Sequence, residues 1–170
     1  MNAARLRFFA TMAFGTLLLS FVFRDETLGI LLVGMRTLTA QAARIGIEAT
    51  GLESIRLGSS LYHPGGFAIQ ISRGCTGFVG ATLLALGVIA YPASRHRRTI
   101  GLAVVVPLFL ATNLVRLVHL YHLGVARSPH FDQAHEVLWQ VALVVIAVGS
   151  WAAWVAWVER RPAPTLPPCP

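Results

Sequence analysis

The sequence predicts an all-α, polytopic transmembrane helix bundle with about four spans, joined to a small periplasmic segment that contains an amphipathic helix and a short β-hairpin. Of the 170 residues, 55% are hydrophobic and only 12% are charged, which is more apolar surface than a soluble domain of this length can bury. The 14 basic residues are scattered between apolar runs, which is typical of a membrane protein and argues against a nucleic-acid partner. We expect residues 1–158 to form a single membrane domain and the Pro-rich residues 159–170 to form a disordered cytoplasmic tail.

The first span is expected at residues 8–23. Arg5 and Arg7 precede this apolar run, and the charged residues 24–26 follow it. A secretory signal peptide would instead end in a small-residue cleavage site. We therefore interpret the run as a retained span with its N-terminus in the cytoplasm.

Residues 24–74 are expected to form the periplasmic segment. Within it, residues 27–50 have apolar positions at helical spacing and polar residues on the opposite side, which predicts an amphipathic helix lying on the membrane or packing on the bundle. A fifth span at 27–50 is the alternative. The apolar positions are Leu28, Leu31, Leu32, Met35, Leu38, Ala42 and Ile45, and the polar ones are Arg36, Gln41, Arg44 and Glu48.

Residues 52–72 lose the helical period and predict the β-hairpin. Residues 55–57 and 67–71 are its expected strands, and the segment 63–66, His-Pro-Gly-Gly, supplies the turn.

Three further spans are expected at residues 75–91, 100–121 and 137–158. At about 1.5 Å of rise per residue, the last two are long enough to cross a bilayer, and the first is marginal without its flanks.

The arginines of the short loops predict the orientation. The loop 93–99 contains three of them and the loop 122–136 contains one, while Arg160 and Arg161 follow the last span. The positive-inside rule then places the N-terminus, the 93–99 loop and the C-terminus on the cytoplasmic side of the inner membrane.

Three chemically distinctive residues are expected at the outer ends of these spans. Cys75 begins the second span, Arg116 lies near the end of the third, and His135 just precedes the fourth. Asn113 and His119 share the helix face of Arg116. Because an arginine in an apolar helix is costly in lipid, this face is expected to line the bundle interior or a wet cavity.

These residue types suit nucleophilic attack on a carbonyl. A cation or a helix N-terminus favours the nucleophilic thiolate over the thiol, and Cys75 is expected near both. His135 can accept or deliver a proton, and Arg116 can stabilise a developing oxyanion. Gly77 would let a substrate backbone approach closely. Arg73 is expected to favour the thiolate or to bind substrate, with a lipid headgroup contact as the alternative.

Each of the three residues also has a purely structural interpretation. Cys75 could be a small buried hydrophobe, and Arg116 could extend along its helix to the membrane surface. His135 could contact headgroups, with His122 and His130 as rival bases.

A metal site is a further chemical alternative. His119 and His122 are three residues apart, which is only loosely co-facial on a helix, and no second clean pair completes a ligand set. We therefore expect neither a metal nor any other cofactor. The remaining candidate ligands are His130, Asp132, His135 and Glu136.

Two short motifs connect these residues to a known family. The segment 72–77, Ser-Arg-Gly-Cys-Thr-Gly, resembles the Cys-(Ser/Thr/Ala)-Gly motif of exosortases and archaeosortases. The segment 113–116, Asn-Leu-Val-Arg, resembles their Asn-x-x-Arg motif, and His135 matches the place of the third catalytic residue. The resemblance covers roughly residues 55 to 155, and the chain is similar to compact members rather than to eight-span ones.

The resemblance implies a membrane-embedded cysteine protease or transpeptidase. Its partners would be membrane-anchored exported proteins that end in a PEP-CTERM-like sorting signal, made of a short motif, a transmembrane helix and a basic tail. Cys75 would form a thioacyl-enzyme, Arg116 would stabilise the oxyanion and His135 would be the acid and base. Asn113 would orient Arg116 or contact substrate. The alternative is a non-enzymatic membrane scaffold or assembly subunit, which would use the same Arg and Asn to hold helices together.

Overall fold

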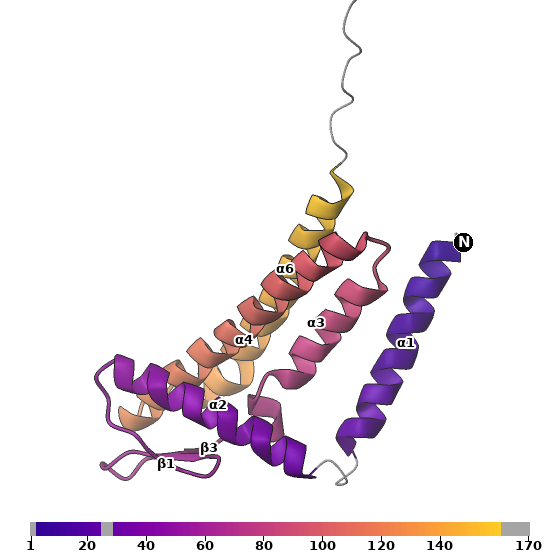
Figure 1. Ribbon diagram of the computed structural model, residues 1–170. Helices are drawn as coiled ribbons and strands as arrows, with labels where there is room; N and C mark the ends of the chain where they lie inside the picture. Colours follow the sequence, from indigo (N-terminus) through magenta and orange to yellow (C-terminus); the bar gives the residue numbers. More distant parts are fainter. Residues whose placement is uncertain (1–2, 25–28, 161–170) are drawn as a thin grey trace, which may run out of the picture.

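The computed structural model describes residues 3–24 and 29–160, most of them in helices. In Figure 1, α1, α3, α4 and α6 run alongside one another, α2 crosses them at one end, and a small sheet lies beside α2. We call this end of the bundle the sheet end. The helices are α1 (Ala3–Arg24), α2 (Gly29–Ala49), α3 (Phe78–Ala90), α4 (Arg95–Val125), α5 (Phe131–Gln133) and α6 (Trp139–Glu159). Beyond Glu159 and Arg160, the expected tail lies outside the described residues, and so does Leu28.

Two helical segments in the described part of the chain, Arg95–Val125 and Phe131–Glu159, are long and apolar enough to cross a membrane. They contain the third and fourth expected spans. The first and second expected spans correspond to α1 and α3, whose apolar segments, Phe8–Leu18 and Phe78–Ala90, are shorter. The mostly helical architecture is therefore confirmed, whereas the count of four spans stays a prediction.

The helix of the second span begins later than predicted. Cys75 lies in a 3₁₀ turn, η2 (Arg73–Cys75), and α3 begins only at Phe78. Between them, Gly77 has a φ of 73°, in the left-handed region, which interrupts a right-handed helix. Cys75 therefore lies ahead of the α3 N-terminus, and the prediction that it opens this helix was wrong.

The helix of the third span is longer than predicted at both ends. Ser94 caps its N-terminus, with Oγ accepting a hydrogen bond from the Arg97 N–H over 3.4 Å. Residues 95–99, expected in a loop, therefore form the first turns of α4.

His135 lies within a helix and not ahead of one. Residues 134–138 form a π-helical turn, η3 (Ala134–Leu138), which links α5 to α6. A π turn holds one residue more than an α turn, and such turns are frequent at functional sites. The extra residue changes the direction in which the preceding side chains point relative to α6.

The amphipathic helix α2 packs on α4 through small residues. Leu31, Leu38 and Ile45, expected on its apolar face, stay more than half exposed. A side chain at Gly46 would meet Val118 of α4, so the two helices approach closely. The buried residues of α2 are Leu32, Ala40, Ala43 and Ile47.

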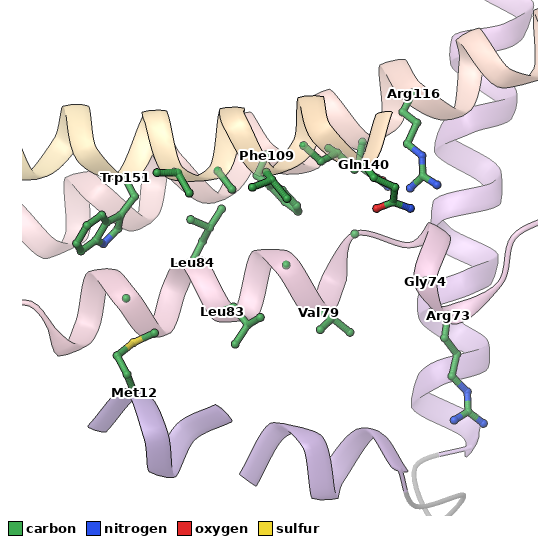
Figure 2. A pocket seen from close by; sticks show the side chains of 18 of the residues that line it. Met12, Arg73, Gly74, Val79, Leu83, Leu84, Phe109, Arg116, Gln140 and Trp151 are labelled. Carbon is green, nitrogen blue, oxygen red and sulfur yellow. The ribbon is translucent and has the colours of Figure 1, made fainter. Parts of the chain in front are cut away.

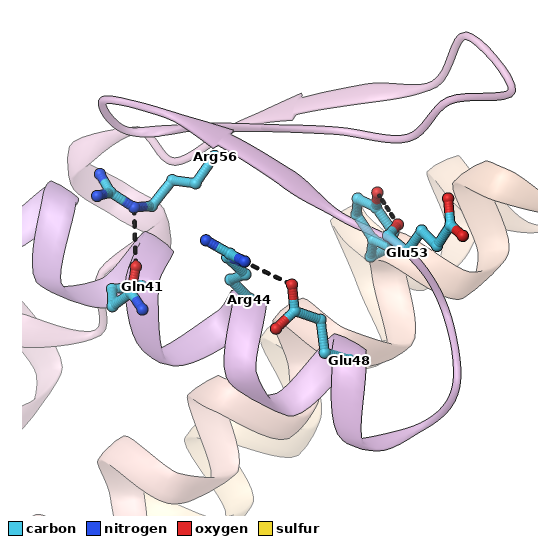
Figure 3. Close-up of polar contacts among 6 residues, drawn as sticks. Gln41, Arg44, Glu48, Glu53 and Arg56 are labelled. Atoms are coloured by element: carbon cyan, nitrogen blue, oxygen red, sulfur yellow. Dashed lines mark hydrogen bonds and ion pairs between the residues drawn. The ribbon is translucent and has the colours of Figure 1, made fainter.

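A three-stranded antiparallel sheet replaces the expected hairpin, because Gly58, with a φ of 60°, allows an additional tight turn. Figure 3 shows two bonds that fix the sheet to the bundle: Arg56 donates to Gln41 of α2 over 2.9 Å, and the Tyr121 hydroxyl of α4 donates to the Glu53 carbonyl over 3.0 Å. The strands, in sheet order, are β1 (Ile55–Leu57), β2 (Ser60–Tyr62) and β3 (Ala68–Gln70).

The opposite end of the bundle, here called the arginine end, joins α3, α4 and α6. The Trp154 indole donates to the Arg97 carbonyl over 3.1 Å, and the Arg97 guanidinium donates to the Val158 carbonyl. The Tyr91 hydroxyl donates to Glu159.

Candidate functional site

Cys75 lies at the sheet end, in the turn that precedes α3. Its side chain is partly buried and packs against a core cluster formed by α2, the sheet and α4. Ser72 contacts it twice: the Ser72 carbonyl accepts from the Cys75 N–H over 3.1 Å, and the Ser72 hydroxyl donates to the Cys75 sulfur over 3.3 Å. These two contacts hold the main chain and the sulfur of Cys75 beside Ser72.

Asn113 joins α4 to the cysteine turn. Its side-chain N–H donates to the Cys75 carbonyl over 2.9 Å, and the residue is only 2% exposed. The Asn113 Oδ1 atom is buried and accepts no hydrogen bond in the described part of the chain. One half of this amide is therefore used to hold Cys75, and the other half is left open.

Gly77 has a steric role in this contact. A Cβ atom at this position would lie 3.0 Å from the Asn113 side chain, and the φ of 73° disfavours any residue with a side chain. Gly77 therefore lets the chain turn directly against Asn113. The close approach expected of Gly77 is made here by a side chain of the protein.

Arg116 lies one helical turn beyond Asn113 and is 2% exposed. Its Nε atom is buried and has no hydrogen-bond partner among the described residues. The alternative in which Arg116 extends to the membrane surface is contradicted by this burial. A buried, incompletely paired cation lowers the stability of the fold, so its presence indicates a functional role.

A cavity of ≈ 470 Å³ lies among α1, α3, α4 and α6, and Figure 2 shows it from close by. Arg116 and Gln140 lie together at its sheet end, while Trp151 lies toward its other end. Arg73 also lines the cavity, but its side chain is directed away from Arg116 in Figure 2. Among the described residues that line the cavity there is no Asp or Glu. The sheet end of the cavity is therefore suited to an anion or a carbonyl oxygen.

His135 lies on the π turn, and its ring stacks on Phe131 at 6.1 Å between centroids and 5° between planes. No polar partner holds its ring nitrogens in the described structure. The rival base His122 is instead bonded to Thr50 over 2.7 Å. The other rival, His130, is exposed at the surface.

His119 is joined to the fourth-span helix. The Trp139 indole N–H donates to its Nδ1 over 2.9 Å, so the proton of the neutral ring is on Nε2. Since Nδ1 accepts this bond, His119 serves as a link between α4 and α6. Among the described residues, no group of three His, Cys, Asp or Glu side chains could hold a metal ion.

The structure thus brings together some of the predicted site residues and not others. Arg73, Gly77, Asn113 and Arg116 line one cavity. Cys75 is joined to this group through its carbonyl, but its side chain is not part of the cavity wall, and neither His119 nor His135 lines it.

Two further polar residues at this site were not identified from the sequence. Gln140 is a lone amide in the apolar run of α6, which is a signal for a functional position inside a membrane. Ser72 carried no such signal, because its contact with Cys75 depends on the 3₁₀ turn.

A family model described as transmembrane exosortase matches residues 3–152, which include the cysteine turn, α4 and the π turn. No curated protein and no solved structure matches the chain.

Proposed function

The chain belongs to the transmembrane exosortase family, and from this premise we propose that it is a membrane-embedded cysteine protease or transpeptidase that removes the C-terminal sorting signal of exported proteins. The proposal is carried by one observation. Arg116 is buried, its Nε has no hydrogen-bond partner in the described part of the chain, and it lies one turn from the amide that holds Cys75.

In the proposed reaction, the Cys75 thiol gives its proton to His135, and the sulfur attacks the carbonyl carbon of the scissile peptide bond. The carbonyl oxygen becomes negatively charged, and the Arg116 guanidinium stabilises it. When the C–N bond breaks, the leaving amine takes a proton from His135, and the substrate remains as a thioester on Cys75. An acceptor amine, hydroxyl or water then attacks the thioester and gives its proton to His135. The C–S bond breaks, and His135 returns the proton to the departing sulfur, which restores the thiol.

The assignment of the proton carrier rests on the state of the histidines at this end. Among the described residues, the His135 ring nitrogens have no hydrogen-bond partner, whereas His119 and His122 are held by Trp139 and Thr50. In the neutral His119 ring, the nitrogen that could accept a proton is already bonded to the Trp139 indole. His135 is therefore the better candidate, with the substrate lying between it and Cys75.

Ser72 and Asn113 have supporting roles in this proposal. The Ser72 hydroxyl positions the sulfur by donating a hydrogen bond to it. Asn113 fixes the position of the cysteine turn relative to Arg116.

We also propose the orientation and the number of spans. The helices α1, α3, α4 and α6 would cross the inner membrane, with the arginine end in the cytoplasm. The site would then face the periplasm, where exported proteins are found.

A non-enzymatic scaffold remains the second candidate, and one observation favours it. The bond from Asn113 to the Cys75 carbonyl is a main-chain contact that a purely structural protein could use equally well. A scaffold would not need the thiol.

The experiment that separates the two uses a tagged exported reporter that ends in the C-terminal tail of an exported protein from the same organism, with a transmembrane helix and a basic segment. The reporter is co-expressed with the wild type, Cys75→Ala and Cys75→Ser, and its size is followed by immunoblot. Loss of the shortened product in both variants is expected. Full processing by Cys75→Ala would remove the protease proposal.

A further inference from the structure

The cavity between α3 and α6 is elongated along the bundle. On α3 its wall extends from Gly77 to Gly87, which is about 15 Å at 1.5 Å per residue. That is about half the thickness of the hydrocarbon core of a bilayer. On α6 the wall extends from Gln140 to Trp151, so the cavity runs parallel to the helices.

The wall of the cavity suits a helix more than a soluble ligand. Apart from the polar residues at its sheet end, its lining is apolar, and two of its glycines, Gly80 and Gly87, are covered by the rings of Phe109 and Trp151. In lipid, helices associate by close van der Waals packing, since burial of apolar surface gives no advantage there. A helix lying in the cavity would gain this close packing.

The cavity is open toward the surroundings of the bundle on the α6 side. Val144 and Val148 line it and yet are each 61% exposed. A membrane-embedded partner could therefore reach the cavity sideways from the bilayer.

Two buried polar atoms at the sheet end, Asn113 Oδ1 and Arg116 Nε, have no partner among the described residues, and both suit the N-terminal end of a bound helix. The first turn of any α-helix has N–H groups without intrahelical partners, and the open Asn113 Oδ1 is an acceptor for one of them. The open Arg116 Nε is a donor and would take a carbonyl oxygen of the residues just before that helix. A lipid acyl chain could fill the apolar part, but it has no N–H group for Asn113.

We propose that this cavity receives the transmembrane helix of the substrate, with the N-terminal end of that helix at Asn113 and Arg116. This inference rests on the proposed function for the identity of the partner. The segment that precedes the substrate helix would then lie beside the cysteine turn, so docking of the helix sets which peptide bond Cys75 attacks.

Two neighbouring valines provide a matched test. Val144 lines the cavity and Val145 does not, although their exposed fractions are 61% and 62%. Each is replaced separately by the photoreactive amino acid p-benzoylphenylalanine in a Cys75→Ser background. Cells that also express the tailed reporter are irradiated, and crosslinked products are identified by immunoblot and mass spectrometry.

We expect the variant with the photoreactive residue at position 144 to crosslink to the transmembrane helix of the reporter, and the variant with it at position 145 to give no such crosslink. Equal crosslinks at both positions, no reporter crosslink at either, or capture of lipid alone at position 144 would each overturn it.

A second pair of variants keeps the test independent of the crosslinker. Val144→Trp fills the cavity and is expected to abolish reporter processing, whereas Val145→Trp is expected to leave it unchanged. Alkylation of Cys75 at the wild-type rate in both variants verifies that the fold is intact. Undiminished processing by Val144→Trp would contradict the proposal.

These results separate the two proposals. If Cys75→Ala still processes the reporter while position 144 crosslinks to it, the protease function fails and the docking site stands. If processing requires Cys75 but position 144 never reaches the reporter, the docking site alone fails.

Discussion

The side-chain amide of Asn113, in the third expected span, donates a hydrogen bond to the main-chain carbonyl of Cys75 over 2.9 Å. These residues are 38 positions apart in the sequence. The contact fixes the turn that carries the thiol against the helix that carries Arg116.

Replacement of Asn113 by alanine leaves the Cys75 carbonyl without its donor. Loss of one partner of a buried hydrogen bond typically costs about 1–3 kcal/mol, so we expect a fall of this size in the free energy of unfolding in detergent, together with loss of reporter processing. Thr112→Ala is the control, because the Thr112 hydroxyl bonds only to Leu108 of its own helix. Equal stability and activity in the two variants would show that the Asn113 contact is unimportant.

Gly77→Ala and Gly74→Ala form a matched pair. At Gly77 an added methyl group meets Asn113 at 3.0 Å in a left-handed backbone conformation, whereas at Gly74 the nearest atom is 4.0 Å away. We expect Gly77→Ala to destabilise the fold by about 1–3 kcal/mol and Gly74→Ala to be nearly neutral. Thermal unfolding of both variants in detergent measures the difference, and similar values would contradict the steric role of Gly77.

Removal of the Ser72 hydroxyl should slow the chemistry of the thiol. A typical hydrogen bond contributes about 0.5–1.5 kcal/mol net, so Ser72→Ala should lower the rate of Cys75 alkylation at neutral pH by about two- to tenfold. Ser72→Thr keeps the hydroxyl and should restore most of the rate. An unchanged alkylation rate in Ser72→Ala would mean that the bond to the sulfur does not affect its reactivity.

Arg116→Lys should not preserve activity. A lysine keeps the charge but lacks the planar guanidinium with its several donors, and loss of an oxyanion donor typically costs about 10²–10³ in rate. Arg127→Lys, at an exposed position outside the cavity, is the control. The rate of reporter processing distinguishes the two variants. A fully active Arg116→Lys enzyme would show that the positive charge alone is sufficient and that the guanidinium donors are not needed.

His135→Ala should reduce the rate of reporter processing by about 10²-fold or more, since general acid–base catalysis contributes about 10²–10⁴. His130→Ala should remain active, because His130 is an exposed residue that lines no described cavity of the protein. A reversed result, with His130 essential and His135 dispensable, would transfer the role of proton carrier.

The helical architecture could be predicted because apolar runs and periodicity are local properties of the chain. Residues 100–121 and 137–158 lie within the two helices of spanning length, and residues 27–50 gave the amphipathic helix α2. The N-capping Ser94 lengthens α4 beyond its apolar run, which hydropathy alone does not detect.

The connections near the site were harder to predict than the helices, because each depends on the backbone conformation of one or a few residues. The left-handed Gly77 separates Cys75 from α3, and the tight turn at Gly58 creates a third strand. The π turn around His135 has no sequence pattern of its own and changes where that ring points.

The candidate residues were found from their chemical rarity in an apolar chain, and their contacts only from the structure. Asn113 and Arg116 were expected on one helix face, and they do line one cavity. The bond between Asn113 and the carbonyl of Cys75 joins residues too far apart in sequence for any local pattern to reveal. The roles of Cys75, Arg116 and His135 in catalysis stay predictions.

The most direct test of the central claim is a search for the covalent intermediate. The wild-type protein is purified after co-expression with the tailed reporter, quenched in acid and examined by mass spectrometry. A reporter fragment joined to Cys75 through a bond that hydroxylamine cleaves is the predicted result. The proposed role of Cys75 would be contradicted if the cells contain processed reporter but Cys75 is never acylated, and if Cys75→Ala gives the same amount of processed reporter.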